Sequence, residues 1–259
     1  MAGRTIKYSW LLLIGSLLFS QSMINRLKVP VIMKGTMGFG YDNNFLRLSE
    51  KEIREDDVTK YGISSTLDSP ILKPTVKLRY SPAIIDGKTT NIITSVSYSY
   101  FTQSAQKSYL ISNVSIGMKL RSYSWIKVGI RDIPKYYLRK YHDRDLSNVA
   151  YYDCSFSNQK YYGSYSYPIK WIRTTWLRVY IDFTKEYYNS HFTEFDLHKT
   201  MFQFDLNHKY KKNYQIKFYI AHGNANNISY GSYSSSTIID RSYIFDKVRG
   251  EFVYKTKRI

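Results

Sequence analysis

The chain has 259 residues, enough for one substantial domain, and its 38 Lys and Arg residues against 20 Asp and Glu residues give a formal net charge of +18. Its single cysteine excludes an internal disulfide, so hydrogen bonds and packing must hold the fold. The basic residues are dispersed and no nucleic-acid-binding motif is present, so we expect no nucleic-acid partner. The 27 Tyr and 13 Phe residues are typical of strands.

Residues 1–22 have the three parts of a secretion signal. Arg4 and Lys7 supply the positive start, residues 10–19 form an apolar run, and small residues precede the expected cleavage point. The run is shorter than the roughly 20 residues that a membrane-spanning helix needs. We expect a cleaved signal peptide here, with a retained anchor as the alternative. The expected domains are listed in chain order as 1–22 signal peptide, 23–32 periplasmic spacer and 33–259 β-barrel domain.

The stretch GTMGFGYDNN at residues 35–44 follows the spacer. Gly38 and Gly40 share one face of a strand, where close backbone approach or a bend is useful, and Asp42 and Asn44 end the strand through turn chemistry. Together with Tyr41, these residues resemble the first strand of bacterial outer-membrane β-barrel proteins, including barrel domains of the surface lipoprotein assembly modifier type. The resemblance implies an antiparallel transmembrane β-barrel in the bacterial outer membrane, with membrane lipid around it and the outer-membrane assembly machinery as a partner.

Apolar and polar residues alternate along most of the chain, as in strands with one apolar and one polar face. Val76 and Leu78, for example, alternate with Lys77 and Arg79. The pattern predicts about ten strands, near 33–42, 70–81, 90–102, 108–122, 125–138, 147–158, 170–184, 198–208, 212–222 and 238–256. Many of these segments reach the roughly 9–11 residues that a tilted strand needs to cross a bilayer.

The polar face carries charges that a dry core would not accept without partners, whereas a water-filled lumen would. Eight basic residues are candidates for the lumen wall: Lys77, Arg79, Lys119, Arg121, Lys127, Arg131, Arg178 and Lys217. Cations around a lumen favour anions, so the expected cargo is an anionic solute, with an exported protein as the alternative. A soluble secreted β-protein that binds a ligand would instead bury the apolar face.

Long connections are expected at 43–69, 139–146, 185–197 and 223–237. In the first of them, Ser49 and Glu52 have the spacing of a capping box that opens a short helix, although a solvated charged loop fits equally well. The apolar phase changes at residues 198–200, and we interpret the change as the end of a loop rather than a bulge. The final residues 255–259 lack the terminal aromatic residue of outer-membrane barrels, which indicates either an atypical last strand or part of a larger barrel.

Glu194, Asp196 and His198 lie at alternate positions, so in a strand their side chains share one face, with His191 nearby. Carboxylates and imidazoles on one face are candidates for a catalytic or metal site. No Gly-x-Ser-x-Gly nucleophile motif accompanies them, and a polar outer loop explains the same residues. We expect no enzyme activity, cofactor or metal. The preferred function is a pore, a transport or export channel, or a structural membrane protein; a barrel enzyme acting on membrane lipids is the alternative.

Overall fold

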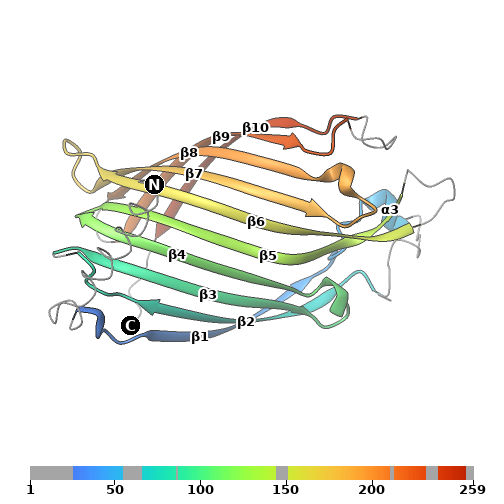
Figure 1. Ribbon diagram of the computed structural model, residues 1–259, viewed down its shortest axis with the longest axis horizontal. Coiled ribbons are helices and arrows are strands. Elements are labelled where there is room, and N and C mark those ends of the chain that lie inside the picture. Colours follow the sequence, from blue (N-terminus) through green and yellow to red (C-terminus); the bar gives the residue numbers. More distant parts are fainter. Residues whose placement is uncertain are drawn as a thin grey trace, which may run out of the picture.

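The computed structural model describes residues 26–54, 66–85, 87–143, 151–210, 213–231 and 239–254. These residues form one antiparallel sheet of ten strands in the order of the chain (Figure 1). The strands are β1 (Ile32–Asp42), β2 (Ser69–Tyr80), β3 (Thr89–Phe101), β4 (Tyr109–Arg121), β5 (Ser124–His142), β6 (Tyr151–Pro168), β7 (Thr175–Tyr188), β8 (Leu197–Tyr210), β9 (Tyr214–Asn227) and β10 (Tyr243–Tyr254). This architecture confirms the prediction of an all-β, antiparallel fold with about ten strands.

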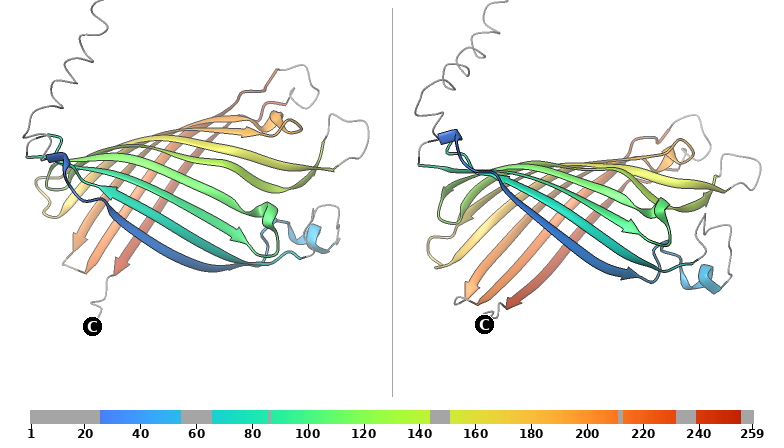
Figure 2. Two further views of the ribbon diagram at one scale, coloured as in Figure 1. Left: turned by 60° about the horizontal axis from the view of Figure 1, so that its bottom comes forward. Right: turned by 90° about the horizontal axis from the view of Figure 1, so that it is seen from below.

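The sheet is a simple meander, because every strand pairs with the strands before and after it in the chain. It curves strongly from β1 to β10 (Figure 2). Within the described ranges, β1 pairs only with β2 and β10 only with β9, so the sheet is not closed. Closure into a barrel therefore stays a prediction. The expected signal peptide, residues 1–22, lies outside the described residues.

Strand β6 is longer than the sequence pattern predicts. Residues 159–168, expected to lie largely outside strands, continue β6 and pair on both sides: Lys160 lies opposite Arg131 and Thr184. The alternation is hidden here because tyrosines occupy both faces, as with the adjacent Tyr161 and Tyr162. As a result, the connection between β6 and β7 is the short segment 169–174.

The phase change before β8 comes from a loop that ends earlier than expected. Residues 193–195 form the 3-10 helix η3, and β8 begins at Leu197. Residues 198–200 pair without interruption with both neighbouring strands, so they contain no bulge. The expected position of the loop end was therefore wrong: the loop ends at Asp196, and residues 198–200 contain neither a loop end nor a bulge.

Two further short helices lie in connections at the same end of the sheet. Helix α3 (Glu50–Arg54) follows β1, and the 3-10 helix η2 (Ala105–Lys107) joins β3 to β4. None of the helices in the described ranges has the length and apolar character that a bilayer-spanning helix requires. The connections that follow β1, β3, β5, β7 and β9, including those that carry α3, η2 and η3, leave this end of the sheet, which we call the long-connection end.

Candidate functional site

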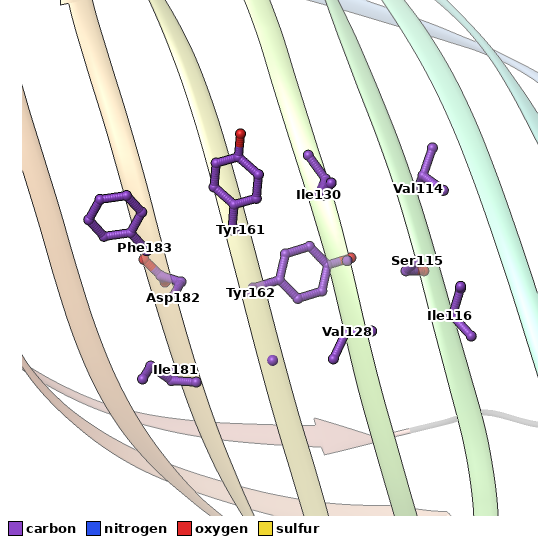
Figure 3. A pocket seen from close by; sticks show the side chains of 12 residues that line it. Val114, Ser115, Ile116, Val128, Ile130, Tyr161, Tyr162, Ile181, Asp182 and Phe183 are labelled. Carbon is purple, nitrogen blue, oxygen red and sulfur yellow. The ribbon is translucent and has the colours of Figure 1, made fainter. Parts of the chain in front are cut away.

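The outer face of the sheet is apolar and exposed. Ile116 is 48% exposed, Val128 is 54% exposed and Phe204 is 47% exposed, although all three lie in the middle of paired strands. Around Gly163, which has no side chain, the apolar side chains of β4 to β7 surround a shallow depression (Figure 3). An apolar face of this extent is unusual for a surface in contact with water.

The inner face is concave and polar. Tyr109 of β4 and Phe245 of β10 line the same recess, although five strands separate them, which requires that the sheet curve around this face. A second recess, of about 510 Å³, lies above β3 to β8 and is lined by hydroxyl and amide groups together with Lys127, Arg178 and Asp205. This concave face is the candidate functional site.

Gly129 allows a tyrosine to lie flat across the floor of the concave face. A Cβ atom at Gly129 would lie 2.5 Å from Tyr162 Cζ, so only glycine leaves room for this ring. The Tyr162 hydroxyl passes over β5 and donates a 3.0 Å hydrogen bond to Asn113 Oδ1 on β4. Lys127 Nζ lies 5.5 Å from the centre of the Tyr162 ring. The ring thus connects three strands on the polar side.

The structure places seven of the eight candidate lumen-wall residues on the concave face. They are Lys77, Arg79, Lys119, Lys127, Arg131, Arg178 and Lys217, and cross-strand pairing aligns them with other concave-face residues. Arg121 differs, because a register shift after Lys119 aligns it with Ser124, and its guanidinium stacks over Tyr167 at 5.6 Å. Of the seven, Arg178 and Lys217 form ion pairs, with Asp205 at 3.9 Å and with Glu251 at 2.8 Å.

The residues of the first-strand motif organise the connection that follows β1. The Tyr41 hydroxyl donates to the carboxylate of Asp68, and the Asp42 carboxylate accepts the Asn44 backbone N–H at 3.0 Å. The Asn44 side chain donates to Leu48 O at 2.7 Å and accepts the Leu48 backbone N–H at 2.9 Å. These bonds bend the chain back toward the sheet directly after the strand.

The two glycines of the motif share the concave face of β1; of the two expected alternatives, a close backbone approach or a bend, the close approach is absent. A Cβ atom at Gly38 would lie 3.5 Å from the nearest atom, in Lys73, and one at Gly40 would lie 3.9 Å from Ile71. These are ordinary contact distances. The two glycines therefore leave part of the concave face of β1 without side chains, and no described backbone segment other than the paired strand β2 passes close to them.

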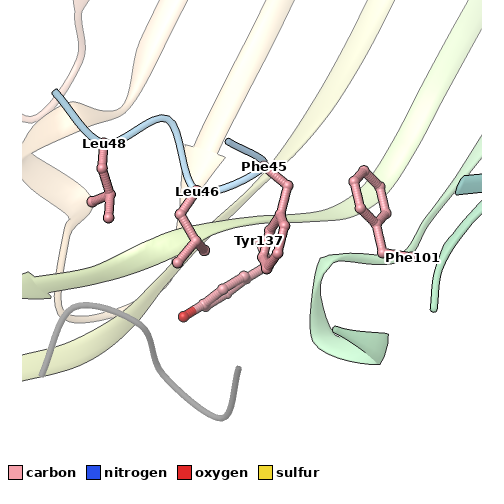
Figure 4. Close-up of a cluster of buried hydrophobic side chains, with 5 residues drawn as sticks. All are labelled: Phe45, Leu46, Leu48, Phe101 and Tyr137. Atoms are coloured by element: carbon pink, nitrogen blue, oxygen red, sulfur yellow. The ribbon is translucent and has the colours of Figure 1, made fainter. Parts of the chain in front are cut away.

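The first connection covers part of the long-connection end with a small apolar core (Figure 4). The buried side chains of this core are Phe45, Leu46, Leu48, Phe101 and Tyr137. Two register shifts in β5 flank Tyr136 and Tyr137. Such irregularities change the direction in which side chains point, and here the Tyr137 side chain points toward the first connection. This core was not predicted from the sequence; the available signal was the cluster of apolar residues in Phe45-Leu-Arg-Leu48, directly after the turn that ends β1.

Two charged groups hold the apolar core in place. Glu52 forms a capping box with Ser49, which decides between the two alternatives for this segment, and it forms a 3.1 Å ion pair with Arg139. The Ser49 backbone N–H, its hydroxyl and Arg139 lower the pKa of Glu52 to about 2. Lys107 is buried in η2 and donates to Tyr137 O at 2.8 Å. Burial, with the nearby Arg47, lowers the pKa of Lys107 to about 8.

The titratable residues around β8 have separate local partners. His191 Nδ1 lies 3.0 Å from Asp143 Oδ2, whereas His198 Nε2 lies 3.0 Å from the Tyr187 hydroxyl. Asp196 accepts the Tyr188 backbone N–H at 2.6 Å. In the described part of the chain, neither histidine hydrogen-bonds to a serine hydroxyl, and no group of three metal-ligating side chains converges. The geometry gives no support to a catalytic or metal centre here.

No protein-family model matches the chain, and comparison with curated proteins finds no match.

Proposed function

We propose that this protein is a transmembrane β-barrel of the bacterial outer membrane and that it provides a polar passage for solutes. The observation that carries the proposal is the division of one sheet into an exposed apolar outer face and a polar, charged concave face. Ile116 and Phe204 on the outer face contrast with Lys119 and Asp205 on the concave face of the same strands. The apolar outer face suits contact with lipid, and the polar concave face suits contact with water in a lumen.

Strand length supports a membrane setting. The described strands have 11 to 19 residues, whereas crossing a bilayer needs about 9–11 tilted residues. Strands of soluble proteins average about 5–6 residues. Tyrosine and tryptophan side chains are exposed near both ends, as with Tyr100, Tyr187 and Tyr210 on strands and Trp171 in a turn. Rings with one polar end favour the interface between lipid and water.

The register of the ten strands supports closure between β1 and β10. The row of paired residues that starts at Lys34, near the start of β1, passes through Arg131 and ends at Tyr243, the first residue of β10. A barrel of ten strands spaced about 4.8 Å apart and tilted by about 35–45° returns to its first strand with a stagger of about 10–14 residues. Only even values keep the two faces separate.

This stagger predicts which outer residues of the two edge strands meet. Because the row that starts at Lys34 ends at Tyr243, Tyr243 meets the β1 edge at a position displaced from Lys34 by the stagger. In the antiparallel pairing of β1 with β10, Phe39 then lies opposite Val248, Gly250 or Phe252 for staggers of about 10, 12 or 14 residues. All three positions lie within β10. Both edges therefore overlap over most of their length, and closure satisfies backbone groups that an open sheet in lipid would leave unpaired.

Disulfide scanning tests the barrel. Phe39→Cys is combined in turn with Val248→Cys, Gly250→Cys or Phe252→Cys, in protein refolded into detergent and lacking Cys154, with Ile244→Cys as the mismatched control. We expect one of the three pairs to form an intramolecular disulfide, in protein that also shows a heat-dependent shift on a denaturing gel. No intramolecular disulfide, or bonds between chains only, would contradict closure of this sheet on itself.

A further inference from the structure

The cations of the concave face are divided between two environments. Seven of them, on β1 to β5, form no ion pair with any described residue; we call these the basic wall: Lys34, Lys73, Lys77, Arg79, Lys119, Lys127 and Arg131. Strands β1 to β5 are described completely, and the concave face of these strands carries an acidic residue only at the end of β1, where Asp42 lies 3.9 Å from Arg47.

The concave face of β6 to β10 has the opposite character, because each acid there has a cation beside it. The pairs are Lys160 with Asp182 at 3.1 Å, Lys199 with Glu186 at 2.7 Å, Arg178 with Asp205 at 3.9 Å and Lys217 with Glu251 at 2.8 Å. These pairs neutralise four cations of this half and leave Lys209, Lys247 and Arg249, of which Arg249 shares Glu251 with Lys217. The larger part of the unbalanced positive potential of the concave face therefore comes from the basic wall.

The arrangement of the basic wall is unfavourable without a counter-ion. Lys34 lies directly opposite Lys77 on the neighbouring strand, and Arg79 lies two residues along β2 on the same face. Like charges directly opposite one another in a sheet are destabilising. An anion between them removes this repulsion and accepts charge-assisted hydrogen bonds from both strands.

A recess that suits a small polar solute adjoins the basic wall. Ile93 lines this recess of about 510 Å³ and is the cross-strand neighbour of Arg79, while Trp125, also in the lining, is the neighbour of Lys119. Ser115 and Ser164 add hydroxyl groups to the same lining. Lysine, arginine and serine groups together recognise phosphate and carboxylate oxygens.

We propose that the basic wall binds a small solute that carries two or more phosphate or carboxylate charges. The inference rests on the proposed passage function, and it assigns the recognition to one half of the concave face. Lys34 and Lys73 join the candidate residues, whereas the ion-paired Arg178 and Lys217 contribute little. Binding at this wall concentrates multivalent anions over monovalent ones, because several cations act on one ligand.

Calorimetric titration with inorganic tripolyphosphate tests the basic wall in folded protein in a non-ionic detergent at low salt. The variants are Lys34→Gln, Lys77→Gln and their combination, with Lys217→Gln as the matched control on the ion-paired half. We expect affinity to fall about tenfold for each cation removed from the basic wall, and to change little in Lys217→Gln. Added salt should weaken binding to the wild type, because screening reduces the attraction.

Two outcomes would overturn the inference: wild-type protein that does not bind tripolyphosphate, or a Lys217→Gln variant that weakens binding as much as Lys34→Gln does. Lys34 is exposed, so its substitution should leave folding intact even where the double variant misfolds. The heat-dependent gel shift of each sample reports separately on the barrel. If the wild type folds only without detergent, the barrel proposal fails, and the same titration still tests the basic wall.

Discussion

Replacing Phe204 by arginine tests which environment meets the apolar face. Phe204 lies in the middle of β8, between Val179 and Ile220 of the adjacent strands, and it is 47% exposed. An arginine on the lipid side of a barrel near the bilayer midplane costs about 2–4 kcal/mol. Removing the Phe side chain from apolar surroundings adds about 2 kcal/mol. We expect Phe204→Arg to lower the free energy of unfolding in a bilayer by about 4–6 kcal/mol.

The adjacent residue supplies the matched control. Gln203 lies on the concave face, and its Nε2 donates to Asp205 Oδ1 at 2.6 Å, so Gln203→Arg places the same charge beside a carboxylate. We expect this variant to change the free energy of unfolding by less than about 1 kcal/mol. Urea unfolding in phospholipid vesicles, followed by tryptophan fluorescence, measures both variants. Equal losses, or a Phe204→Arg variant as stable as the wild type, would refute the assignment of the outer face to lipid.

Two further predictions concern the floor and one end of the concave face. Gly129→Ala should destabilise the fold by about 1–3 kcal/mol, because the new Cβ would collide with the Tyr162 ring. Gly163→Ala should be tolerated, because the nearest atom to its Cβ would lie at 3.7 Å. Urea unfolding measures the free energy of unfolding of both variants. The pKa of Lys107 is lowered to about 8, below the roughly 10.4 of a lysine in an unfolded chain, so the folded state releases its proton at a lower pH than the unfolded state. The free energy of unfolding of the wild type should therefore rise as the pH increases from about 8 to about 10.4. Lys107→Met should lack that rise, and identical pH profiles for both proteins would contradict the burial argument.

The sequence by itself determined the strands and their two faces. Alternation such as that of Val76, Lys77 and Leu78 depends only on the period of two in an extended chain, so it needs no knowledge of the neighbouring strands. For the same reason the prediction failed in β6, where Tyr161 and Tyr162 fit either face. The capping box of Ser49 and Glu52 was also readable, because it is formed within one turn.

Only the tertiary structure decided which side chains meet. The register brings Lys34 opposite Lys77, with no acidic partner for either among the described residues, while it pairs Lys217 with Glu251. The members of each pair are far apart in the sequence. The packing of Phe45 against Tyr137 likewise joins the connection after β1 with strand β5, although β2, β3 and β4 lie between these two strands in the sheet. Pairing between distant strands depends on the summed packing and hydrogen bonding of the whole sheet, which no local pattern encodes.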